Sequence, residues 1–197
     1  CRAFCAAYHL FCTSEVHDMK KTIRDIDWSD KTAVVRCDFN VPLVNGKISD
    51  DTRIVAALPT INYLRDNGAK VVILSHLGRP KGEPNDDFSL YPVAERLSER
   101  LGAHVNFIKS DVVVDDKVYE AVKNLAPSEV ALLENVRYRS EETKNNPTFA
   151  RELASLGDVF VQEAFGTAHR AHASTTGIAD YIPAVSGFLI EKELKFL

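Results

Sequence analysis

Basic side chains stand directly after apolar, β-branched runs at several separate places in this sequence. The runs are residues 33–40, 71–80, 130–138 and 158–172. They lead into or contain a set of basic groups, namely His76, Arg79, Arg137, His169, Arg170 and His172. If each run is a strand of one parallel sheet, these groups leave the sheet at a single edge, where open α/β sheets bind ligands. In a chain of net charge −4, such a gathering predicts a site for a small anion.

Two polar residues, Asp38 and Asn40, end the first of these runs. By themselves they are typical of a turn, in which short polar side chains bond to the nearby backbone. Arg53 stands in the first turn of a predicted helix, where a cation opposes the helix dipole. This placement indicates either a local role for Arg53 or an ion pair with Asp50 or Asp51.

Zinc and nucleophile chemistry have weaker signals. His169 and His172 form an HxxH pair, but no cysteine or acidic ligand pattern accompanies them, so structural or anion-contacting histidines are favoured over a zinc site. A metal-dependent hydrolase that uses His76 together with this pair is an alternative hypothesis, and it is the least favoured one. The chain also lacks GxSxG, GxxxxGK(S/T) and GxGxxG patterns. Side chains are therefore expected to hold the anion, and any nucleotide is expected to bind elsewhere.

The chain has 197 residues, of which 45% are hydrophobic and 26% are charged. This length suits one generous domain with its own core. The acidic balance argues against nucleic acid as a partner, because binding to a phosphate backbone needs a broad basic surface. No apolar stretch approaches the length of a membrane span.

The cysteines and the first residues bear on the compartment. Cys1, Cys5 and Cys12 crowd the start of the chain and Cys37 stands alone in a predicted strand, which favours a reduced, cytoplasmic environment over a disulfide framework. Residues 1–18 differ in character from the rest, and the stretch from residue 19 reads like a natural start. We expect residues 1–18 to be an unstructured extension; a weak signal or transit peptide is the alternative.

Helix and strand signals alternate along the rest of the chain. Helices are predicted over residues 49–68, 89–102, 115–125 and 145–157 and from Gly187 onward, and strands in the four runs above and over 104–108. Pro59 should kink or split the first helix, and Ser89 should cap the second. Residues 78–89, rich in Gly, Pro and Asp, are expected to form a mobile surface loop. The alternation predicts an α/β fold, a doubly wound parallel sheet with helices on both faces in a Rossmann-like three-layer sandwich.

Six segments of the sequence resemble the N-terminal domain of the phosphoglycerate kinase family, and they occur in the family's order. They are VRCDFNVPL (35–43), DDTRIVAALPTINYL (50–64), SHLGRPKG (75–82), LLENVRY (132–138), EAFGTAHRAHAST (163–175) and GFLIEKEL (187–194). The resemblance runs from Met19 to Leu197. The usual family patterns read VRVDFN, ENVRF and VNDAFG, and this chain departs from them at Cys37, Tyr138 and Gln162–Glu163.

The resemblance implies one domain of a two-domain glycolytic kinase. Residues 19–186 would bind 3-phosphoglycerate or 1,3-bisphosphoglycerate, and residues 187–197 would begin an interdomain helix. MgATP or MgADP would bind a C-terminal domain beyond this chain, so no cofactor is expected on the chain alone. The reaction would be reversible phosphoryl transfer between 1,3-bisphosphoglycerate and ADP in a cytoplasmic monomer without nucleic-acid or membrane partners. The chain alone would be inactive as a kinase. The alternative hypothesis is that the protein is a truncated, catalytically inactive anion-binding module.

The resemblance also implies roles for individual residues. Arg79, Arg137 and Arg170, with His76, would clamp the phosphate that is not transferred. Asp38 and Asn40 would orient the hydroxyl and carboxyl end of the substrate. Arg53 would be the catalytic residue, facing the phosphoryl group in flight. The substrate-binding set is completed by Phe39, Leu77 and Gly78, and no metal ligands are expected.

Overall fold

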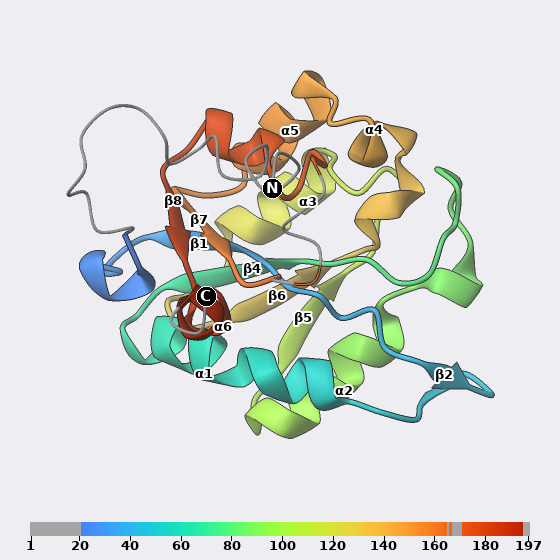
Figure 1. The fold of residues 1–197 in the computed structure, drawn as a ribbon, viewed down its shortest axis with the longest axis horizontal. Coiled ribbons are helices and arrows are strands. Elements are labelled where there is room, and N and C mark those ends of the chain that lie inside the picture. The colour runs from blue at the N-terminus through green and yellow to red at the C-terminus, as the bar shows by residue number, and fades with distance from the viewer. Residues whose placement is uncertain (1–20, 165, 167–170, 195–197) are drawn as a thin grey trace.

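A six-stranded parallel sheet forms the centre of the molecule (Figure 1). The computed structural model describes residues 21–164, 166 and 171–194. The strand order is β5-β6-β4-β1-β7-β8. The strands are β1 (Thr32–Arg36), β4 (Lys70–Leu74), β5 (Val105–Ile108), β6 (Val130–Leu133), β7 (Val159–Gln162) and β8 (Ala184–Ser186). The predicted doubly wound α/β fold is confirmed.

The strands are apolar because both faces of the sheet are covered. In β1, Ala33 and Val35 belong to one buried cluster, and Val34, which points the other way, belongs to a second. The same alternation divides β4, where Val71 and Ile73 join the first cluster. The molecule therefore has two cores, one on each face of the sheet.

The helices divide between these two faces (Figure 1). On one face lie α1 (Thr52–Asp66), α2 (Tyr91–Leu101) and α6 (Phe188–Leu194), and on the other lie α3 (Asp116–Lys123), α5 (Pro147–Ala154) and the short α4 (Ser140–Thr143). The caps at Asp115 and Asn146 accept hydrogen bonds from the first helical N–H groups, as their sequence signals indicate. No helix among the described residues is long and apolar enough to cross a membrane.

The structure differs from two helix predictions in detail. Pro59 does not split α1, which runs through it without a break. The carbonyl that loses its N–H partner there belongs to Val55, a residue that is 42% exposed and so faces water. Ser89 does not cap α2, because the N-cap is Leu90. The Ser89 hydroxyl donates to the buried carboxylate of Glu134, which also accepts from the Leu90 N–H.

Two further elements had no clear sequence signal. The strand β8 has only three residues, too few to show a period, and it lies between a proline and a glycine. The hairpin of β2 (Leu43–Val44) and β3 (Lys47–Ile48) is shorter still. The segment 78–89 does run over the surface, but Gly82, Asn85 and Phe88 within it are hydrogen-bonded to residues 135–138. Residues 1–18, predicted to lack a fold, lie outside the described residues.

Candidate functional site

The segments that follow β1, β4 and β6 meet at one edge of the sheet, as the sequence predicts. These strands are neighbours in the sheet and parallel. The Phe39 N–H donates to the Ser75 hydroxyl at 2.9 Å, and the Gly78 N–H donates to Asn40 Oδ1 at 2.8 Å. The Arg137 guanidinium in turn donates to the Gly78 carbonyl at 2.9 Å. One chain of hydrogen bonds therefore ties the three segments together.

Three of the predicted substrate-binding residues, Phe39, Leu77 and Gly78, support the fold at this edge of the sheet. The side chains of Phe39 and Leu77 are buried in the core, with exposed fractions of 0% and 3%, so only their backbone could reach a ligand. Gly78 has φ +59°, and a Cβ there would run into the ring of Phe88. Glycine is therefore required at this turn, and Asn40 holds its N–H in place.

A basic pocket opens beside this edge, with a volume of about 530 Å³. It is lined by Arg79, Lys81, Gly82, Arg137, Arg139, Ser140, Thr143, Lys144 and His172. No acidic residue lines it within the part of the chain that the structure describes. Arg79, Arg137 and His172 thus come together as predicted, and Lys81 and Lys144 add charges that the sequence analysis did not single out.

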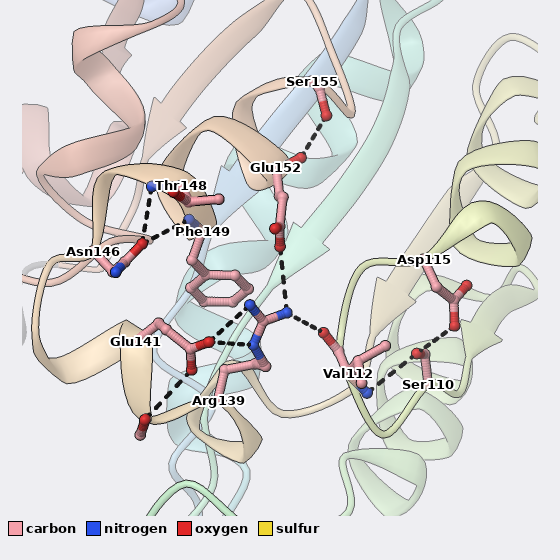
Figure 2. A network of polar contacts seen from close by, with 11 residues as sticks. Ser110, Val112, Asp115, Arg139, Glu141, Asn146, Thr148, Phe149, Glu152 and Ser155 are labelled. Carbon is pink, nitrogen blue, oxygen red and sulfur yellow. Dashed lines mark hydrogen bonds and ion pairs between the residues drawn. The ribbon is translucent and has the colours of Figure 1, made fainter.

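Arg139 belongs to the wall of the basic pocket, but its guanidinium is committed to protein groups (Figure 2). It donates to Glu141 at 2.9 Å and to Glu152 at 3.3 Å, and also to the Val112 carbonyl at 3.1 Å. The guanidinium carbon lies 4.7 Å from the centre of the Phe149 ring. Arg139 therefore shapes the pocket rather than offering it a free positive charge.

His76 does not line the basic pocket, although the sequence analysis placed it in the phosphate clamp. The residue is 3% exposed, and its Nδ1 atom lies 3.0 Å from Nη2 of Arg36. Arg36 is itself fully buried and also donates to the Ser174 hydroxyl and the Cys37 carbonyl. Burial lowers the pKa of Arg36, an effect that the carboxylates of Glu142 and Asp38 oppose.

Sequence reasoning missed Arg36 because it is the last residue of an apolar strand and reads as part of it. The available signal was a charged residue inside a run that is otherwise buried on both faces. It also missed Glu142, which looks solvated in the polar segment SEET but is fully buried. Both residues are buried by partners that are distant in sequence.

Arg53 pairs with Asp38, and the expected ion pair with Asp50 or Asp51 is absent among the described contacts. Nη1 of Arg53 lies 2.5 Å from Oδ2 of Asp38. Asp51 instead binds Arg96 and Arg100 of α2, and Asp50 accepts hydrogen bonds from Thr52. The hydrogen bonds from Thr52 lower the pKa of Asp50. The position of Arg53 in the first turn of α1 marks it as unusual from sequence, whereas its partner Asp38 lies 15 residues earlier and is brought to it by the fold.

Arg53 and Asp38 line a separate cavity of about 220 Å³, which we call the Arg53 cavity. Its other walls are Ala56, Ala57, Glu163, Gly166, Leu189 and Glu193. Glu163 lies at the end of β7 and is 1% exposed. It accepts from the Thr60 hydroxyl of α1 at 2.9 Å and from the Leu189 N–H of α6 at 3.2 Å. Burial raises the pKa of Glu163 to about 8 despite these two hydrogen bonds.

Arg170 and His169 lie outside the described residues, so their predicted roles stay predictions. Within the described ranges, no group of three or more His, Cys, Asp or Glu side chains is placed to hold a metal ion. His172 has Nδ1 at 3.7 Å from Oε1 of Glu142. The described residues therefore give no support to the hypothesis of a zinc site.

Comparison with known proteins gives a consistent result. The family model for phosphoglycerate kinase matches residues 23–197. The phosphoglycerate kinases of Clostridium botulinum and Clostridium kluyveri are each 57% identical over 179 residues, which is 90% of this chain and 45% of theirs. The chain thus spans about half the length of the curated relatives it matches.

Solved structures agree with the sequence relatives. The structure of phosphoglycerate kinase from Coxiella burnetii has a TM-score of 0.80 at 41% identity, and it covers 90% of this chain and 44% of that one. The phosphoglycerate kinase of Pyrococcus horikoshii OT3 has a TM-score of 0.81 at 38% identity, with coverage of 89% and 44%.

Proposed function

The chain belongs to the phosphoglycerate kinase family, and from this premise we propose that it forms the phosphoglycerate-binding part of a two-domain kinase. The full reaction is reversible phosphoryl transfer between 1,3-bisphosphoglycerate and ADP. Such transfer depends on positioning and charge stabilisation more than on covalent catalysis. The described residues offer the means for both.

The basic pocket is the observation that carries this proposal. Arg79 and Arg137 line it without an acidic neighbour in its described walls, and their guanidinium forks suit the geometry of a phosphate group. We place the non-transferred phosphate there, with Arg170 as a third ligand by family resemblance. His76 acts from behind, through its contact with the buried Arg36.

The other end of the substrate lies toward Asp38 in this proposal. Asp38 orients the substrate hydroxyl as a hydrogen-bond acceptor, and Asn40 keeps the Gly78 turn in place. Arg53 is the catalytic arginine. When the phosphoryl group is in flight, its equatorial charge competes with Asp38 for the Arg53 guanidinium and is stabilised by it.

The nucleotide binds elsewhere in this proposal. The chain contains no glycine-rich phosphate loop, and the relatives are about twice as long. MgADP or MgATP is therefore assigned to the second domain, and closure of the two domains brings the substrates into line. Action in the cytoplasm as a monomer remains a prediction.

Calorimetry on the chain tests the proposal. We expect 3-phosphoglycerate to bind, and glycerate, which lacks the phosphate, to bind much more weakly. ADP and ATP should not bind with affinity comparable to that of 3-phosphoglycerate. Tight nucleotide binding together with no response to 3-phosphoglycerate would refute the assignment.

A further inference from the structure

A chain of buried polar groups runs behind the basic pocket, from Glu142 of α4 through Ser174 to Arg36 of β1. We propose that Glu142 is a positioning residue for phosphoglycerate: it fixes the wall segment 172–174 and the guanidinium of Arg36, and thereby sets the affinity of the basic pocket. The inference rests on the proposed function and adds a residue that does not touch the substrate.

Glu142 holds the segment 172–174 through both its backbone and its side chain. Its carbonyl accepts from the Ala173 N–H at 3.0 Å. One carboxylate oxygen accepts from the Ser174 N–H at 2.9 Å and the other from the Ser174 hydroxyl at 2.6 Å. The second oxygen also lies 3.7 Å from Nδ1 of His172, which lines the basic pocket. Four contacts thus converge on one carboxylate-bearing residue.

The Ser174 hydroxyl passes this anchoring on to Arg36. It accepts from Nε of Arg36 at 2.8 Å and donates to Glu142, so its proton has a defined direction. Nη2 of Arg36 then lies 3.0 Å from Nδ1 of His76. The polar chain therefore joins β1 and the segment after β4 to α4 and the segment 172–174. Ser140 and Thr143 of α4 and His172 line the basic pocket, where the phosphate is proposed to bind.

The charges in this chain explain why it must stay intact. Arg36, Ser174 and Glu142 are each 0% exposed, and a buried charge is costly unless it is paired and hydrogen-bonded. Burial raises the pKa of Glu142, while Arg36 and the Ser174 hydrogen bonds oppose that shift. Removing the carboxylate would leave the buried Arg36 without its main counter-charge and weaken the support for the Ser174 hydroxyl that its Nε–H contacts.

The sign of the effect separates this role from simple electrostatics. Changing Glu142 to glutamine removes a negative charge close to a pocket for anions. Long-range attraction alone would then strengthen phosphoglycerate binding. The positioning role predicts the opposite. The two Ser174 donors use different carboxylate oxygens, and glutamine replaces one of these oxygens with an NH₂ that cannot accept a hydrogen bond.

The experiment is calorimetry with 3-phosphoglycerate on the wild-type chain, Glu142→Gln, Ser174→Ala and the double variant. We expect each single variant to bind 3-phosphoglycerate roughly tenfold more weakly than wild type. The double variant should bind about as weakly as either single variant, because the two residues act as one unit. Glu120→Gln is the control. It removes a charge of the same sign from α3, where Glu120 pairs with the exposed Lys123 outside the pocket lining, and it should bind within about twofold of wild type.

A spectroscopic readout accompanies the binding data. The Nε–H resonance of Arg36, followed in assigned ¹H–¹⁵N spectra, should shift in Glu142→Gln and Ser174→Ala and stay in place in Glu120→Gln. Unchanged or tighter binding in a folded Glu142→Gln variant overturns the inference. If that variant does not fold, Ser174→Ala carries the same test, and wild-type affinity there overturns it too. A wild-type chain that binds no 3-phosphoglycerate refutes the proposed function and this inference with it.

Discussion

Replacing Glu163 with glutamine should make the protein's stability much less dependent on pH. Glu163 joins three elements, because its carboxylate accepts from Thr60 of α1 and Leu189 of α6 at the end of β7. Glutamine has the same shape and keeps one oxygen for these two donors. The substitution therefore removes the ionisable proton and leaves the packing nearly unchanged.

The direction follows from the raised pKa. Burial takes the pKa of Glu163 from 4.5 to about 8, so the folded state holds a proton that the unfolded chain releases. This contribution is fully favourable below the unfolded pKa and is lost as the pH rises toward and past 8. At about 1.36 kcal/mol per pKa unit, the wild type should lose roughly 4 kcal/mol between pH 5 and pH 9 from this group alone.

Urea unfolding of both proteins between pH 5 and pH 9 measures the effect. The free energy of unfolding of Glu163→Gln minus that of wild type should grow by about 4 kcal/mol across this range. Cys37, Arg53 and Glu193 also lie near this carboxyl group, but they are common to both proteins and largely cancel in the difference. Glu83→Gln, which changes an exposed carboxylate, should track the wild type. A difference that stays flat, or that favours the wild type at pH 9, would show that the reasoning is wrong.

Three other substitutions test the site and its frame. Arg137→Ala should weaken 3-phosphoglycerate binding by about 1.5–3 kcal/mol in calorimetry, whereas Arg151→Ala, outside the pocket, should leave it unchanged. If Arg137→Ala binds as tightly as wild type, Arg137 does not contact the phosphate. Arg53→Ala, made in a complete two-domain kinase, should lower turnover roughly 100-fold with little change in the Michaelis constant; the reverse pattern would contradict its catalytic role. Gly78→Ala should lower the free energy of unfolding by at least about 1–2 kcal/mol because of the positive φ. A free energy of unfolding in urea equal to that of wild type would contradict this prediction.

The sheet could be predicted because its strands are buried on both faces and therefore apolar throughout. Residues 71–75 and 130–134 show this pattern, and β4 and β6 lie where it indicates. The strand β8 is too short for a periodic signal. Helix ends were predictable where a local rule suffices, as at Gly102, which caps α2 with φ +60°. Helix ends could not be predicted where a group distant in sequence determines them, as at Ser89, whose hydroxyl donates to Glu134.

The same division holds for the site. Residues that leave the sheet beside a parallel neighbour, such as Arg137 and Gly78, can be placed from sequence because the topology fixes where they emerge. The buried pair of Arg36 and Glu142 could not, since Ser174, which connects them, is 138 residues from Arg36 in the chain. Nothing local distinguishes a glutamate that is solvated from one that a later segment covers.

The short segment after β1 connects the two cavities that the proposed function assigns to one substrate. Asp38 faces Arg53 and lines the Arg53 cavity. Two residues later, Asn40 holds Gly78, whose carbonyl holds Arg137 in the wall of the basic pocket. A displacement of this segment would therefore alter both cavities together. For the proposed substrate, which carries a phosphate at one end and the transferred group at the other, such a shared support would keep the distance between Arg137 and Arg53 constant, as in-line transfer requires.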